Sequence, residues 1–107
     1  MWVSGGVLSN LQVDDVLADT GPLAIGAVTL NIFAWTEDNP TLRIEHRNAL
    51  NTLTLHDLRF SPATAQMQGG FQIQMLMVLL LNERVRVLVE DPGASTSRTQ
   101  VTIQSLV

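Results

Sequence analysis

The sequence contains no cysteine, no lysine and no tyrosine. Without cysteine the chain can form neither a disulfide nor a thiolate metal site. Without lysine it has no residue for a Schiff base or for a Gly-Lys phosphate-binding loop. Charged residues make up only 15% of the chain, against roughly 25% in a typical soluble domain. Much of its surface must therefore be neutral, covered either by Ser, Thr, Asn and Gln side chains or by a partner.

Positive charge is scarce as well. The six basic residues are all arginines scattered along the chain, and the net charge is −4. A nucleic-acid surface needs clustered positive charge, so we expect no nucleic-acid partner. The N-terminus lacks the pattern of a signal peptide, and no apolar run reaches the roughly 20 residues of a membrane-spanning helix. We therefore expect a soluble chain with no membrane contact, and its 107 residues fit a single domain, 1–107.

The hydrophobic pattern predicts strands. Residues 23–35 and 100–107 read as strands, with Val28, Leu30 and Ile32 on one face of the first. Residues 7–18 are ambiguous: Ser9 could cap a short helix there, or the segment could join a sheet. With five to seven strands and turn signals between them, the chain is predicted to be mainly β, a single-domain antiparallel β-sandwich or small barrel with at most one short helix.

A first hairpin is predicted at residues 41–56, because both of its halves alternate apolar and polar side chains. A two-residue turn at Asn48-Ala49 would suit the left-handed backbone that Asn tolerates. This register pairs Leu42 with Leu55, Ile44 with Leu53, and His46 with Asn51. It places His46 and His56, the two imidazoles of the chain, on opposite faces, which argues against a shared metal site.

A second hairpin is predicted from about Phe71 to Glu90, with its turn at Asn82-Glu83. Its core face would pair Leu80 with Val85, Val78 with Val87, and Leu76 with Val89. The reverse face carries Met75, Met77, Leu79, Leu81, Arg84, Arg86 and Leu88. Because residues 75–81 are apolar on both faces, this strand is expected to lie centrally in a sheet, with material on each side. In a domain of this size, another chain could cover the second face of this strand, so the reverse face is the candidate interface.

The sequence shows no catalytic, cofactor-binding or metal-binding set. It contains no G-x-S-x-G nucleophile elbow. Asp14, Asp15 and Asp19 lack the spacing of a calcium loop and fit a turn better. The chain is therefore expected to be non-enzymatic and to need no cofactor.

Two functions are considered. In small size, β-rich pattern and low charge, the chain resembles phage virion structural proteins such as capsid cement (decoration) or head–tail joining proteins. That resemblance implies a symmetric arrangement of subunits on a capsid, expected to be trimeric, with the chain itself or the larger assembly as protein partners and the virion as location. The alternative is a monomeric Ig-like binding module that uses its end loops, Glu37–Pro40 and Gly93–Ser97.

Overall fold

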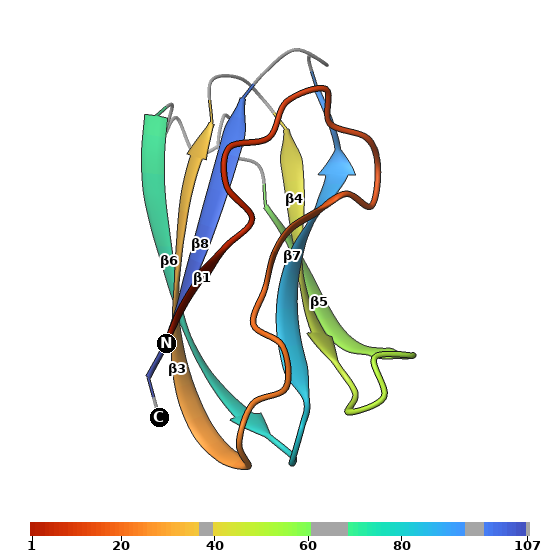
Figure 1. The fold of residues 1–107 in the computed structure, drawn as a ribbon, viewed down its shortest axis with the longest axis vertical. Helices are drawn as coiled ribbons and strands as arrows, with labels where there is room; N and C mark the ends of the chain where they lie inside the picture. The colour runs from red at the N-terminus through yellow and green to blue at the C-terminus, as the bar shows by residue number, and fades with distance from the viewer. Residues whose placement is uncertain (37–39, 61–68, 94–97, 107) are drawn as a thin grey trace.

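The computed structural model describes residues 1–36, 40–60, 69–93 and 98–106, which form a two-layer β-sandwich (Figure 1). Its strands are β1 (Trp2–Ser4), β2 (Val16–Asp19), β3 (Gly26–Thr36), β4 (Thr41–Arg47), β5 (Thr54–Phe60), β6 (Gly69–Leu79), β7 (Arg84–Asp91) and β8 (Thr99–Leu106). One sheet has the order β1-β8-β3-β6 and the other β2-β7-β4-β5, and every recorded strand pair is antiparallel. The predicted sandwich is confirmed.

The core lies between the two sheets and is built by alternating side chains. In β3, Val28, Leu30 and Ile32 point inward and are at most 1% exposed, as the sequence predicts. Val101 and Ile103 of β8 join them, and β4 and β7 supply the opposite wall. Period-two alternation buries one face of each strand, so this phase can be read from local sequence.

The predicted first hairpin exists, but its register is wrong. Leu42 pairs with Phe60, Ile44 with Leu58, and His46 with His56. The connection is longer than two residues, because the Asn48 side chain accepts hydrogen bonds from the backbone N–H groups of Thr52 and Leu53 at 2.8 and 3.0 Å. This side-chain cap closes a wider loop and shifts every cross-strand pair.

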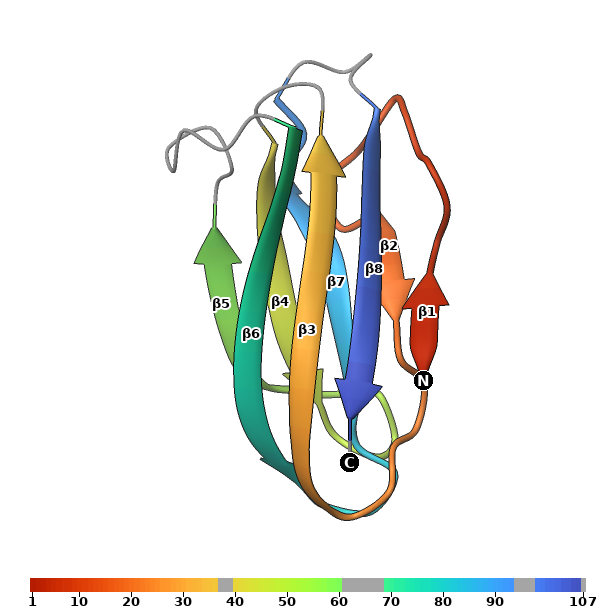
Figure 2. The same cartoon turned by 90° about the vertical axis from the view of Figure 1, so that its left-hand side faces the viewer.

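The predicted second hairpin is wrong, because its two strands lie in different sheets. β6 pairs with β3, whereas β7 pairs with β2 and β4. Residues 80–83 therefore connect one sheet to the other, at the lower end of the molecule in Figure 2. Leu76, Val78 and Leu80, predicted to be core, are 74%, 73% and 65% exposed. Nor is β6 central: it is the outermost strand of its sheet.

The ambiguous segment 7–18 forms no helix. Leu8 makes an isolated antiparallel bridge to Thr99, and the segment ends in β2, which pairs with β7. Among the described residues, no helix has the length and apolar character needed to cross a membrane.

Candidate protein-interaction surface

The two sheets differ in charge. The strands β1, β3, β6 and β8, which form one sheet, contain no charged residue at all. The strands of the other sheet contain ten, namely Asp19, Arg43, Glu45, Arg47, Asp57, Arg59, Arg84, Arg86, Glu90 and Asp91. The four strands of the first sheet thus have no charged side chain, although the chain as a whole has a net charge of −4.

We call the outward side of the uncharged sheet the neutral face. It comprises the outward side chains of the four strands: Trp2, Ser4, Ala27, Thr29, Asn31, Phe33, Trp35, Gln72, Gln74, Leu76, Val78, Gln100, Thr102, Gln104 and Leu106. In Figure 2 this sheet lies in front, with β6 at one edge and β1 at the other. Its polar members are amides and hydroxyls, which can form hydrogen bonds with a partner without the desolvation cost of a charge.

Amides order the middle of the neutral face. Asn31 on β3 donates to Gln104 Oε1 on β8 at 3.1 Å, and Gln72 on β6 donates to Asn31 Oδ1 at 3.3 Å. These bonds join three strands and hold the amides against the sheet. Beside them, the rings of Trp2 and Phe33 stack with their centroids 5.7 Å apart, a separation typical of a stabilising aromatic pair.

The β6 side of the neutral face is aliphatic at the end that adjoins Gly26. Leu76 and Val78 lie on it, and Ile25 and Leu80 adjoin the end where Gly26 pairs with Leu79. All four named aliphatic side chains are more than 60% exposed. Apolar side chains scattered singly over a surface are ordinary, but neighbouring ones on an uncharged face are typical of a protein contact site.

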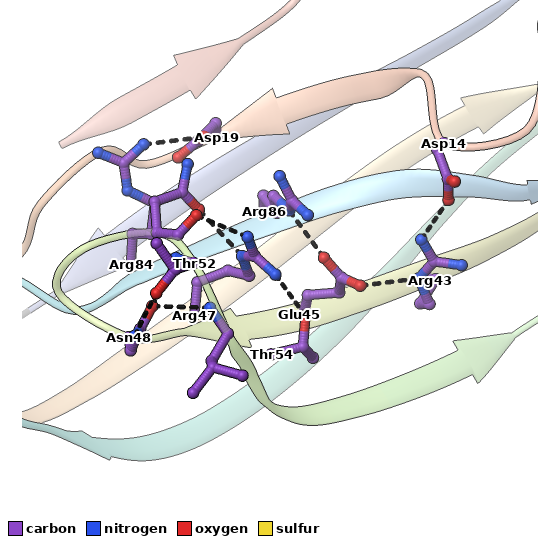
Figure 3. A network of polar contacts seen from close by, with 12 residues as sticks. Asp14, Asp19, Arg43, Glu45, Arg47, Asn48, Thr52, Thr54, Arg84 and Arg86 are labelled. Carbon is purple, nitrogen blue, oxygen red and sulfur yellow. Dashed lines mark hydrogen bonds and ion pairs between the residues drawn. The ribbon is translucent and has the colours of Figure 1, made fainter.

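The opposite, charged face is internally paired (Figure 3). Glu45 accepts hydrogen bonds from Arg86 at 2.7 Å and from Arg43 at 3.0 Å, and Arg43 also contacts Glu90 and Asp14. Burial raises the pKa of Glu45, but the hydrogen bond and charge of Arg86, aided by Arg43, outweigh it and leave the pKa below its usual range. Hydrogen bonds with Asp14 and Glu90 raise the pKa of Arg43 despite partial burial. Of the ten charged residues on these strands, eight take part in recorded ion pairs, whereas Arg47 hydrogen-bonds to Asn51 and Thr54.

This pairing predicts acid sensitivity. Hydrogen bonds from Arg59 and Arg43 lower the pKa of Glu90, so it and Glu45 both have folded-state pKa values below the ordinary 4.5. The folded state then binds fewer protons than the unfolded state, so stability is full above about pH 5 and falls as the pH drops through the lowered values. Urea unfolding at pH 7 and pH 3 should show a smaller free energy of unfolding at pH 3. Equal values would contradict the pairing.

A cleft opens between β5 and β6, where the two sheets part. Ile44, Leu58, Met75 and Met77 line it with His46, His56 and Asp57, and its volume is about 70 Å³. Ligand pockets are typically about 300–1,000 Å³, so this cleft is small for an organic substrate. Among the described residues, no group of three or more His, Cys, Asp or Glu side chains could hold a metal ion.

The two histidines meet at this cleft. Their rings stack with centroids 5.8 Å apart, because His46 and His56 are direct cross-strand partners. Their predicted placement on opposite faces is therefore wrong, and the shifted hairpin register is the cause. His46 is buried and its Nε2 lies 3.0 Å from Glu83 Oε1, so this ring has a structural partner.

The seven residues of the sequence-predicted interface do not share one surface. Met75 and Met77 are partly buried and line the cleft, Leu79 and Leu88 are buried, Leu81 is exposed after β6, and Arg84 and Arg86 lie on the charged face. The two arginines pair with Asp19 and Glu45 of their own chain. Leu79 and Leu88 thus offer little surface to a partner.

The neutral face was not identified from the sequence, although a signal for it is present. Residues 23–36, 69–81 and 99–107 are three long segments without charge. Each can be recognised separately, but only strand pairing shows that they lie side by side.

The end loops proposed for a binding module are Glu37–Pro40 and Gly93–Ser97. Pro40 and Gly93 are described, whereas residues 37–39 and 94–97 lie outside the described residues.

No protein-family model matches the chain, and no curated protein matches its sequence. Among solved structures, the globular domain of zebrafish complement 1qA protein is similar, with a TM-score of 0.53 and 12% identity over 80% of this chain and 66% of that domain. A carbohydrate-binding module, CBM36, solved with calcium and xylotriose, has a TM-score of 0.49 and 8% identity over 99% of this chain and 88% of that one. These comparisons do not test the virion resemblance, which stays a prediction. The chain has a β-sandwich fold similar to that of the complement globular domain.

Proposed function

We propose that this protein is a non-enzymatic structural subunit that assembles with copies of itself through the neutral face. The observation that supports this most directly is the absence of charge from all four strands of that sheet, together with the exposure of Leu76 and Val78 at 74% and 73%. A face without charge can pack against its own copy without like-charge repulsion. On the charged face, by contrast, most of the charged side chains already pair with one another.

The size of the neutral face suits such a contact. β3 and β6 have 11 residues each, β8 has 8 and β1 has 3, so the four strands cover a flat area of about 500 Å². The side chains that project from them give the face a larger accessible surface than this flat area. Each partner in a stable complex buries roughly 600–1,000 Å². A symmetric array on a capsid surface, as the resemblance to cement proteins implies, is one setting for this assembly.

The test is light scattering on a sizing column across a concentration range. We expect the wild-type chain to self-associate, and Leu76→Asp and Val78→Asp each to weaken association by about tenfold or more, because each buries a charge in the contact. Leu53→Asp is the matched control, since Leu53 is 61% exposed but lies between β4 and β5.

A wild-type chain that stays monomeric at high concentration would overturn the proposal and favour the binding module. Association that Leu76→Asp and Leu53→Asp affect equally would show that the contact lies elsewhere.

A further inference from the structure

The described part of the sandwich has four sheet edges, and they differ in length and protection. β1 and β2 have only 3 and 4 residues, and the β2 pairing contains a register shift. β5 has 7 residues and includes His56, Asp57 and Arg59. β6 has 11 residues and pairs with β3 on one side only.

β6 lacks the features that usually protect an edge. Natural edge strands are kept short, bulged, or supplied with charge or proline, because unpaired N–H and C=O groups otherwise recruit another strand. β6 has no charged residue and no proline, and its pairing with β3 runs through all 11 positions without a register shift. Its free side is therefore a long, regular row of backbone donors and acceptors.

We propose that the free edge of β6 pairs, antiparallel and about a two-fold axis, with β6 of a second copy of this chain. An edge of this kind can pair with an extended strand. β6 of a second copy is such a strand, because it is long, regular and uncharged. Opposite residues in an antiparallel pair lie on the same side of the sheet. Gln72, Gln74, Leu76 and Val78 of the two copies would thus face one another without like charges.

This pairing rests on the proposed self-association and adds a second contact, at the sheet edge, which leaves the neutral faces free to pack against further copies. The two uncharged sheets would join into one continuous eight-stranded sheet, so that the neutral faces of both copies form a single larger surface. On the inner side, Ile73, Met75 and Met77 are only partly buried against the core, and Met75 and Met77 line the cleft at this flank. The same side chains of the second copy would lie beside them and cover more of their apolar surface.

The absence of cysteine gives a direct test. A single cysteine placed in turn at positions 72 to 76, from Gln72→Cys to Leu76→Cys, would be the only thiol of the chain. Residues directly opposite in an antiparallel pair have Cα atoms about 4.5–5.5 Å apart, within disulfide range. Under mild oxidation, a disulfide-linked dimer should form strongly at the residue on the two-fold axis and weakly at the positions beside it.

Thr102→Cys, on β8 inside the same sheet, is the matched control. Sheets stacked face to face lie about 10 Å apart, too far for a disulfide, so this variant should not cross-link in either geometry. Uniform cross-linking at all six positions would indicate random collision and overturn the edge pairing.

The result also separates the two proposals. If light scattering shows association and no β6 cysteine cross-links, edge pairing is wrong and association by the neutral face stands. If the chain is monomeric and no variant cross-links, both are wrong.

Discussion

Leu79→Asp is expected to prevent stable folding, whereas Val78→Asp, one residue earlier, should leave the chain folded. Leu79 is 0% exposed and ends β6 within the core, and Val78 is 73% exposed on the neutral face. An unpaired carboxylate in an apolar core costs several kcal/mol, and a domain has only about 5–15 kcal/mol of stability. Aspartate at an exposed strand position costs about 1 kcal/mol or less.

Circular dichroism with thermal and urea unfolding measures both variants. The comparison tests the placement of β6 directly, because the sequence-derived hairpin puts Val78 in the core and Leu79 on the reverse face. In that register the outcomes would be exchanged. A folded Leu79→Asp beside an unfolded Val78→Asp would mean that the pairing of β6 with β3 is wrong.

Glu83→Ala should lower the free energy of unfolding by about 2–4 kcal/mol, the second large effect that we expect. The Glu83 side chain is buried at the connection between the two sheets, where its Oε1 accepts the Leu80 N–H at 2.7 Å and lies 3.0 Å from His46 Nε2. The hydrogen bond from the Leu80 N–H, followed by the contact with His46, lowers the pKa of Glu83. Removal of the carboxylate leaves the Leu80 N–H and the His46 ring without this hydrogen-bond partner in a buried or partly buried environment.

The backbone around Glu83 explains why this connection crosses between sheets. Leu23 N–H donates to the Glu83 carbonyl at 2.9 Å, and Asn82 N–H donates to the Leu23 carbonyl at 3.0 Å. These bonds tie the connection to the chain that enters β3, so the Glu83 side chain holds a junction of both sheets.

Glu83→Gln is the control, because its amide oxygen can still accept the Leu80 N–H. It should lose less stability than Glu83→Ala in the same urea titrations. A Glu83→Ala variant as stable as the wild type would show that the carboxylate does not hold the connection.

The candidate site was only partly predictable. The apolar character of β6 on two sides was evident, and so was the idea that another chain could cover one of them. The side that faces out was assigned wrongly, because a strand that is apolar on both faces carries no alternation to mark its inner side. Pairing with β3 decides it, since Met77 lies opposite Val28 and Val78 opposite Ala27. The stacked histidines were missed because one side chain, Asn48, widened the loop and changed the register.

By itself, the sequence determined the mainly β class, the inward phase of β3 and the scarcity of charge, because alternation and composition are local properties. Only the tertiary structure decided which strands share a sheet, and hence that the uncharged segments unite on one face while the ions collect on the other. Strand partners are chosen by contacts between residues far apart in the chain, such as Thr29 with Leu106. Local sequence at a turn, as at Asn82-Glu83, does not reveal whether the chain returns to the same sheet or crosses to the next.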